Sequence, residues 1–146
     1  MPAQISTAQL RQQKREQRRL LSAAEQEQHA SQLVHQVLHH PRFLNCRRIA
    51  CYLPNDGEID PVYILGQAWS RHKQVFLPVL SPLKNSLQFA PFEPGSMMCT
   101  NRFGIEEPAC PPKHWVKAQH LDLVLLPLVA FDEAGNRLGM GGGFYD

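Results

Sequence analysis

The residues best suited to chemistry lie in a glycine-rich segment at the end of the sequence. From Arg137 to Asp146 it reads RLGMGGGFYD. Glycines allow successive backbone N–H groups to approach one anion closely, and a neighbouring guanidinium can bond two phosphate oxygens. The final aspartate offers a hard oxygen ligand of the kind that Mg²⁺ prefers. The segment therefore predicts a loop for phosphate and Mg²⁺, although glycine strings of this type also occur in ordinary tight turns.

This segment differs from two widespread phosphate-binding loops. It lacks the Gly-Lys-Ser/Thr of a P-loop, and no acidic residue follows about 20 positions later, as it does in the dinucleotide fingerprint. A glycine-rich loop after a strand ordinarily leads into a helix, whereas this sequence stops at Asp146. Backbone groups of such a loop would lack obvious partners. We therefore expect the C-terminal part of a longer protein to be absent from this chain.

A second candidate group is the basic segment near the N-terminus. Residues 7–21 contain neither Gly nor Pro and consist mainly of good helix formers. The helical repeat places Lys14 on one face of this helix, with Arg11 beside it. Residues 1–48 hold eight basic and three acidic side chains, so this end of the chain suits an anionic ligand. The alternative is a basic face that only meets solvent.

Local patterns predict helices that alternate with strands. Ser22 followed by Glu25 is typical of a capping box, which opens a second helix that ends near Pro41. The further elements expected are a strand over 48–53, a helix from Asp60, strands over 74–77 and 87–92, and a strand buried on both faces over 121–129. Residues 93–120 are expected to be irregular. Such alternation predicts one α/β domain over 1–146, with a mainly parallel central sheet flanked by helices.

Composition narrows the class of protein. The chain has 146 residues, 43% of them hydrophobic, and a net charge of +2, which is too small to indicate a nucleic-acid partner. No apolar stretch approaches the length of a membrane span, and no signal peptide is evident. The four cysteines show no Cys-x-x-Cys spacing, so we expect free thiols and a cytoplasmic location. Composition leaves the oligomeric state open, with a monomer as the default.

The wider sequence around the glycines is more specific than the glycines alone. Residues 122–146 contain, in order, an apolar strand, a proline, Phe-Asp, a glycine, R-L-G-x-G-x-G, two aromatic residues and an aspartate. This order resembles the signature of the 5-formyltetrahydrofolate cyclo-ligase family. Three further segments match in the family's order, namely 52–60 (YLPNDGEID), 76–78 (FLP) and 103–108 (FGIEEP). The resemblance covers nearly all of the chain.

The resemblance implies an ATP-driven ring closure. Members of this family, also called 5,10-methenyltetrahydrofolate synthetases, use ATP to phosphorylate the formyl oxygen of 5-formyltetrahydrofolate. The N10 nitrogen then attacks the activated carbon, and the products are 5,10-methenyltetrahydrofolate, ADP and phosphate. The resemblance also implies an α/β fold related to the sugar-phosphate isomerases and CoA transferases. No covalent enzyme nucleophile is needed, so catalysis would depend on positioning and charge neutralisation.

The resemblance further implies roles for the matching residues of the glycine-rich segment. The family loop that holds the ATP phosphates matches Arg137, Gly139, Gly141, Gly142 and Gly143. The aromatic pair beside the reacting centre matches Phe144 and Tyr145, which we expect to contact ATP. Arg137 and Tyr145 are the expected catalytic residues, and Asp146 matches the aspartate on the metal side.

Outside this segment the resemblance implies a folate site and a second contact to ATP. Glu58 matches the family's folate-binding glutamate, with Tyr145 also facing the folate; the alternative for Glu58 is a solvated turn residue. Near the N-terminus the family has a Lys and an Arg one helical turn apart. Arg11 matches that Arg, but Thr7 stands in place of the Lys, and Lys14 keeps the spacing without the register. Arg11 and Lys14 are therefore the candidates for ATP binding.

Other functions remain as alternatives to the cyclo-ligase. A chain that ends at residue 146 would suit a non-catalytic module that binds nucleotide or folate. A nucleic-acid partner is disfavoured by the acidic balance of residues 49–146, and the R-L-G-x-G-x-G string speaks against a sugar-phosphate isomerase. His35 and His39 have helical spacing for a metal, but no third ligand is in sight.

Overall fold

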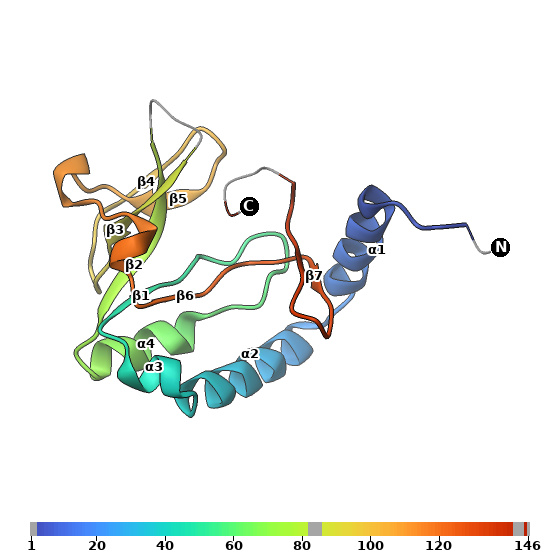
Figure 1. Cartoon of the computed structure of the whole chain (residues 1–146), viewed down its shortest axis with the longest axis horizontal. Helices are drawn as coiled ribbons and strands as arrows, with labels where there is room; N and C mark the ends of the chain where they lie inside the picture. The colour runs from blue at the N-terminus through green and yellow to red at the C-terminus, as the bar shows by residue number, and fades with distance from the viewer. Residues whose placement is uncertain (1–2, 82–85, 142–144, 146) are drawn as a thin grey trace.

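The protein is an α/β structure in which four helices precede or alternate with the strands of one sheet (Figure 1). The computed structural model describes residues 3–81, 86–141 and 145. Its helices are α1 (Thr7–Arg19), α2 (Ala23–Leu38), α3 (Pro41–Asn45) and α4 (Val62–Ser70), with short 3₁₀ turns at Pro112–His114 and Ala118–His120. Its strands are β1 (Arg48–Ala50), β2 (Gln74–Leu80), β3 (Leu87–Pro91), β4 (Met98–Thr100), β5 (Glu106–Pro108), β6 (Leu123–Val124), β7 (Ala130–Phe131) and β8 (Arg137–Leu138).

Both N-terminal helices begin where local chemistry supplies a cap. The Ser22 hydroxyl accepts a hydrogen bond from the N–H of Glu25, and the Glu25 carboxylate accepts one from the N–H of Ser22. Ser6 and Gln9 form the same reciprocal pair at the start of α1. Such pairs satisfy backbone donors that a helix end otherwise leaves open. The predicted helices over 7–21 and from Ser22 onward are thus confirmed.

The central sheet has the strand order β3-β2-β1-β6. β1 pairs in parallel with β2 and with β6, and Ile49 lies opposite Val75 on one side and Leu123 on the other. β3 returns antiparallel to β2. The sheet is therefore mixed, with two of its three pairings parallel, which confirms an α/β fold with helices against the sheet.

Side chains that alternate along β1 and β2 build a core on both faces of the sheet. Ile49 and Leu77 point to the layer of α2, α3 and α4, where they pack with Phe43 and Ile64. Ala50, Phe76 and Phe89 point to the other face, against residues of the 110–124 region. α1 contributes no buried residue to either core.

The region after β3 and the last parallel strand differ from expectation. Residues 93–120, expected to be irregular, contain the antiparallel hairpin of β4 and β5. The expected doubly buried strand over 121–129 is wrong: β6 has two residues, both only half-buried, and Leu126 is exposed. β6 lies at one end of the sheet formed by the described residues, and Pro127 has no N–H to extend a ladder.

Candidate functional site

A cavity of about 420 Å³ opens at the carboxyl ends of the parallel strands. This edge of an α/β sheet is where ligands ordinarily bind, because loops and helix ends meet there. The loops that follow β1 and β6 form the cavity together with parts of β2 and β3, the β4–β5 hairpin and the glycine-rich segment. Its lining residues are Tyr52, Leu53, Asn55, Glu58, Leu77, Pro78, Leu80, Leu87, Asn101, Phe103, Ile105, Glu106, Glu107, Pro127, Leu128, Arg137, Gly139, Met140, Gly141 and Tyr145.

Arg137 stands at the wall of this cavity on strand β8. β7 and β8 form a tight hairpin, in which the Asp132 carboxylate accepts hydrogen bonds from the backbone N–H and the side-chain amide of Asn136, each at 2.8 Å. The Arg137 guanidinium donates instead to the carbonyl oxygens of Tyr145 at 3.1 Å and Pro127 at 3.4 Å. Arg137 thus bridges two segments of the cavity wall.

The basic helix α1 reaches the glycine-rich segment through Arg11. The Arg11 Nε donates to the carbonyl oxygen of Gly139 at 2.7 Å. Gly141 has a φ of +86°, and a Cβ at this position would lie 3.4 Å from the Arg11 guanidinium carbon. The positive φ favours glycine at this position, and the Arg11 guanidinium lies within van der Waals contact of it. Lys14 lies on the exposed face of α1 and donates to Gln17 at 3.3 Å, away from the cavity.

Four of the expected loop residues, Gly142, Gly143, Phe144 and Asp146, lie outside the described residues. Their predicted roles with ATP and metal rest on the sequence.

Glu58 is a half-buried carboxylate in the cavity wall. Its Oε2 accepts a hydrogen bond from the N–H of Asn55 at 3.0 Å, and its own N–H donates to the Asn55 carbonyl at 3.1 Å. Burial raises the pKa of Glu58, although the Asn55 N–H opposes that shift. Burial likewise raises the pKa of Tyr145, and the charge of nearby Glu58 adds to the rise. The arrangement places a carboxylate acceptor beside a neutral phenol, and a solvated turn residue would not have this environment.

Sequence patterns did not predict that Asp56 joins α1 to the loop after β1. Its carboxylate forms ion pairs with Arg15 at 2.7 Å, Arg18 at 3.2 Å and Arg19 at 2.6 Å. Hydrogen bonds from Arg19 and Arg15 lower the pKa of Asp56 to about 2. The sequence predicts a turn at residues 54–57. The pairing of Asp56 in this turn with arginines some 40 positions earlier depends on the tertiary structure.

The hairpin also supplies an apolar wall that sequence patterns did not predict. Phe103 and Ile105, in the turn between β4 and β5, line the cavity while 55% and 42% of their surfaces stay exposed. The Glu107 carboxylate fixes this hairpin to β2, since it accepts hydrogen bonds from Leu80 N–H and the Asn101 amide, both at 3.2 Å. The described cavity therefore has one part formed by Arg137 and the backbone of Gly139 and Gly141, and another part with an apolar wall suited to a flat ring.

Comparison with known proteins identifies the family to which this chain belongs. The model of the 5-formyltetrahydrofolate cyclo-ligase family matches residues 3–146. This chain belongs to the 5-formyltetrahydrofolate cyclo-ligase family. It is 38% identical over 133 residues to the cyclo-ligase of Escherichia coli K12, covering 90% of this chain and 73% of that protein. It is 40% identical over 127 residues to the cyclo-ligase of Haemophilus influenzae, covering 86% and 68%.

Solved structures agree on the fold. The NMR structure of 5,10-methenyltetrahydrofolate synthetase from Aquifex aeolicus matches with a TM-score of 0.81 and 28% identity, over 96% of this chain and 70% of that one. The synthetase from Mycoplasma pneumoniae matches with a TM-score of 0.70 over 96% and 74%; at 23% identity it supports the fold alone. The family resemblance expected from residues 122–146 is thereby confirmed.

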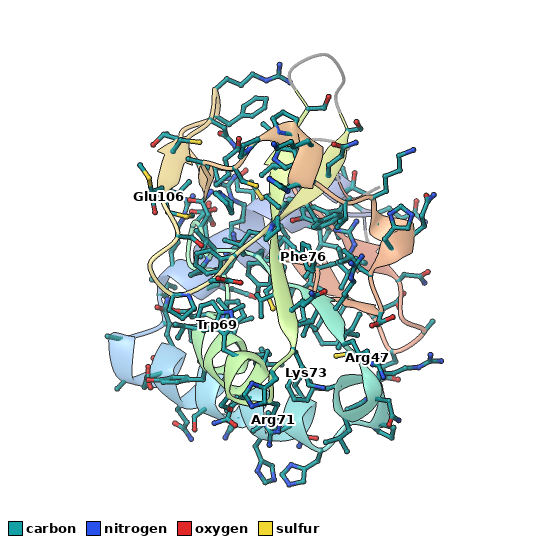
Figure 2. All side chains as sticks on the ribbon, turned by 90° about the vertical axis from the view of Figure 1, so that its left-hand side faces the viewer. Arg47, Trp69, Arg71, Lys73, Phe76 and Glu106 are labelled. Carbon is teal, nitrogen blue, oxygen red and sulfur yellow. The ribbon has the colours of Figure 1, made fainter. Side chains whose placement is uncertain are left out.

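A second hollow, at the amino ends of the strands, is a poorer candidate for the cyclo-ligase site. It measures about 610 Å³, and its lining includes Arg47, Arg71 and Lys73, which Figure 2 labels. The Lys73 ammonium caps the carbonyl oxygens of Cys46 at 2.7 Å and Leu44 at 3.3 Å, so it stabilises the end of α3. This hollow lies at the opposite edge of the sheet from the glycine-rich segment.

Metal ligands are sparse in the described part of the chain. Among residues 3–81, 86–141 and 145, no three His, Cys, Asp or Glu side chains come together as a metal site. His35 and His39 contact each other, with ring centroids 4.5 Å apart, and the His39 Nδ1 lies 2.7 Å from the His35 carbonyl. No helix within the described ranges is long and apolar enough to cross a membrane.

Proposed function

We propose that this chain catalyses the ATP-dependent cyclisation of 5-formyltetrahydrofolate to 5,10-methenyltetrahydrofolate, with release of ADP and phosphate, in the cavity at the carboxyl ends of β1, β2 and β6. Membership in the cyclo-ligase family supports the reaction. The observation that carries the assignment to this cavity is the meeting of Arg11, Arg137 and the glycine-rich segment on one side with Glu58 and Tyr145 on the other.

The ATP half of the site consists of the cationic and glycine-rich wall. Arg137 and Arg11 face the triphosphate, and the N–H groups of Gly139, Gly141, Gly142 and Gly143 complete a nest for its oxygens. Negative charge moves from the transferred phosphoryl group to the departing ADP as the formyl oxygen attacks phosphorus. Fixed guanidinium groups stabilise that charge without reorganising, which lowers the barrier.

The folate half consists of Glu58, Tyr145 and the apolar wall. The Glu58 carboxylate accepts N–H hydrogen bonds from the pterin ring, while Phe103 and Ile105 cover its faces with apolar surface. The carbon of the formyl group, whose oxygen now carries the phosphoryl group, then lies within reach of N10. Attack by N10, loss of its proton and departure of phosphate give the methenyl bridge. The amide oxygen would be a poor leaving group without phosphorylation, so the enzyme's task is to hold both substrates in line.

Mg²⁺ enters this proposal bound to the triphosphate. The cavity lining includes the carboxylates of Glu58, Glu106 and Glu107, but no three His, Cys, Asp or Glu side chains of the described residues come together as a metal site, which fits an ion held mostly by phosphate and water oxygens. Asp146 is the proposed protein ligand, and Phe144 is proposed to contact ATP. When bound, the ion neutralises charge on the phosphate oxygens. We place the enzyme in the cytoplasm, where its four free thiols would stay reduced.

A thermal-shift titration together with a product assay tests the proposal. A ligand that binds only the native state raises stability, by about 2.7 kcal/mol at a concentration 100 times Kd. ATP with Mg²⁺ should therefore raise the melting temperature, and addition of 5-formyltetrahydrofolate should produce the absorbance of the methenyl product. Stabilisation by both ligands without product would favour a binding module, and no effect of ATP would contradict the phosphate-loop assignment.

A further inference from the structure

Helix α1 lacks the apolar anchor that holds most helices to a protein. None of its residues is buried, so burial of apolar surface contributes little to its position. Figure 1 shows it apart from the layer of α2, α3 and α4, beside β7. Its docking depends on polar contacts, and Arg11, the proposed ATP contact, can only point at the glycine-rich segment if those contacts hold.

Most of these polar contacts converge on Asp56. Arg15, Arg18 and Arg19 have the i, i+3 and i+4 spacing that puts them on one side of a helix, and all three bond the Asp56 carboxylate at 2.6–3.2 Å. The carboxylate is 19% exposed and Arg18 is 13% exposed. Partly buried, charge-assisted bonds of this kind are stronger than pairs in open solvent.

Arg18 extends the contact to a second loop of the cavity. The Arg18 Nε donates to the Asp56 carbonyl oxygen at 2.7 Å, and the Arg18 Nη1 donates to the Leu128 carbonyl oxygen at 3.4 Å. Its stem passes the open position of Gly57, where a Cβ would lie 3.5 Å from the Arg18 Cγ. The loops after β1 and β6, which both contribute to the cavity wall, are thus held by one side chain of α1.

We propose that Asp56 is a positioning residue for ATP: it fixes α1 on the loops after β1 and β6, so that Arg11 is held against the glycine-rich segment. The proposal rests on the assignment of the ATP half of the site given above. Asp56 itself acts through Arg11 and touches neither substrate.

Asp56→Asn is the variant best matched to this question. Asp56 has a left-handed backbone with a φ of +52°, and Asn is among the few residues that tolerate it, so the turn keeps its shape while the charge is lost. We expect the Kd for ATP-Mg, measured by calorimetry on the intact enzyme well below its melting temperature, to rise roughly tenfold, within the range that coupled charge networks show. Arg18→Gln, which leaves the left-handed residue untouched, should weaken ATP binding in the same direction.

A double-mutant cycle separates positioning from a general loss of stability. If Asp56 acts through Arg11, the Arg11→Ala, Asp56→Asn double variant should bind ATP no more weakly than Arg11→Ala alone. Asp122→Asn, at the opposite edge of the sheet, is the control and should leave the Kd for ATP unchanged. Additive losses, or a lower melting temperature with unchanged ATP affinity in both Asp56→Asn and Arg18→Gln, would overturn the positioning role.

The same measurements distinguish an error in the proposed ATP site from an error in the proposed role of Asp56. Normal ATP affinity in Arg11→Ala would contradict both the nucleotide assignment of α1 and the role of Asp56. Weak binding by Arg11→Ala with normal binding by Asp56→Asn would overturn the positioning role alone.

Discussion

The two ends of the parallel strands carry similar residues and use them differently. At the amino end, Asp122 accepts hydrogen bonds from the backbone N–H groups of Arg47 and Arg48, both at 2.9 Å. At the carboxyl end, Asp56 is bonded by three arginine side chains from a different helix. The first carboxylate joins neighbouring strands of the same sheet. The second fixes a separate helix at the mouth of a cavity.

This difference shows that charge density alone does not locate the site. The hollow at the amino end is rich in arginine, yet Lys73 within it serves as a cap for α3. The cavity at the carboxyl end combines cations with a half-buried carboxylate, a phenol and an apolar wall. Chemically different walls around one space, rather than a single type of charge, are what a reaction between two different substrates requires.

The largest difference between the two ends should come from arginine deletion. We expect the cyclo-ligase rate of Arg137→Ala to fall by a factor of about 10²–10³. Removal of one fixed hydrogen-bond donor to the charge that develops in the transition state typically slows a reaction by that factor. Arg47→Ala, at the amino end, should retain normal turnover. Formation of the methenyl product by absorbance, with melting curves of both variants in parallel, measures the contrast. Normal turnover of Arg137→Ala with a lowered melting temperature would assign Arg137 to structure only.

A smaller effect, confined to one ligand, is expected at Glu58. Glu58→Gln keeps the size but loses the charge that strengthens N–H hydrogen bonds, so folate affinity should fall about tenfold or more while ATP affinity changes less. Calorimetry with each ligand separates the two. Equal losses for both would contradict the folate assignment.

The same substitution should have an unusual effect on stability. Burial raises the pKa of Glu58, so the folded state holds the proton above the pH at which the unfolded chain releases it. Stability from this group therefore falls as pH rises from the ordinary glutamate pKa through the raised value. Glu58→Gln should melt no lower than the parent at neutral pH, and relatively lower as the solution becomes acidic. Melting curves across pH check this sign.

For Asp56 the pH dependence should have the opposite sign. Its pKa is lowered to about 2, so its contribution is fully present above the ordinary aspartate pKa and is lost as pH falls toward about 2. Asp56→Asn should therefore lower the melting temperature by a constant amount between about pH 5 and 8, and by less below about pH 4. If the difference in melting temperature between Asp56→Asn and the parent grows as the pH falls, the ion pairs of the three arginines with this carboxylate do not stabilise the fold.

The smallest functional effect is expected at Asp122. Asp122→Asn removes the charge that accepts two backbone N–H groups, so it should lower the melting temperature while kcat and KM for both substrates stay unchanged. A change in KM for ATP would show that the amino end communicates with the cavity and would weaken the contrast drawn between the two ends.

Features that depend on neighbours in the sequence were predictable. The capping box at Ser22 and Glu25 fixed the start of α2, and the ordered motif over 122–146 identified the family. The hairpin of β4 and β5 was not predicted, because its strands have three residues each, too few to show an alternation of apolar and polar residues. β6 was wrongly expected to be buried on both faces, since an apolar run does not reveal whether its strand lies inside a sheet or at its edge.

By itself the sequence determined the α/β fold, the family and the glycine-rich segment, because propensities, caps and ordered motifs act over a few residues along the chain. Only the tertiary structure decided which basic residue of α1 contacts the glycine-rich segment. Arg11 reaches Gly139, across 128 positions, whereas Lys14, three residues later, points to solvent. The same holds for Asp56, whose three arginine partners lie 37–41 positions away. A helical repeat defines which side chains share a face, but the rotation of that helix is set by what it packs against.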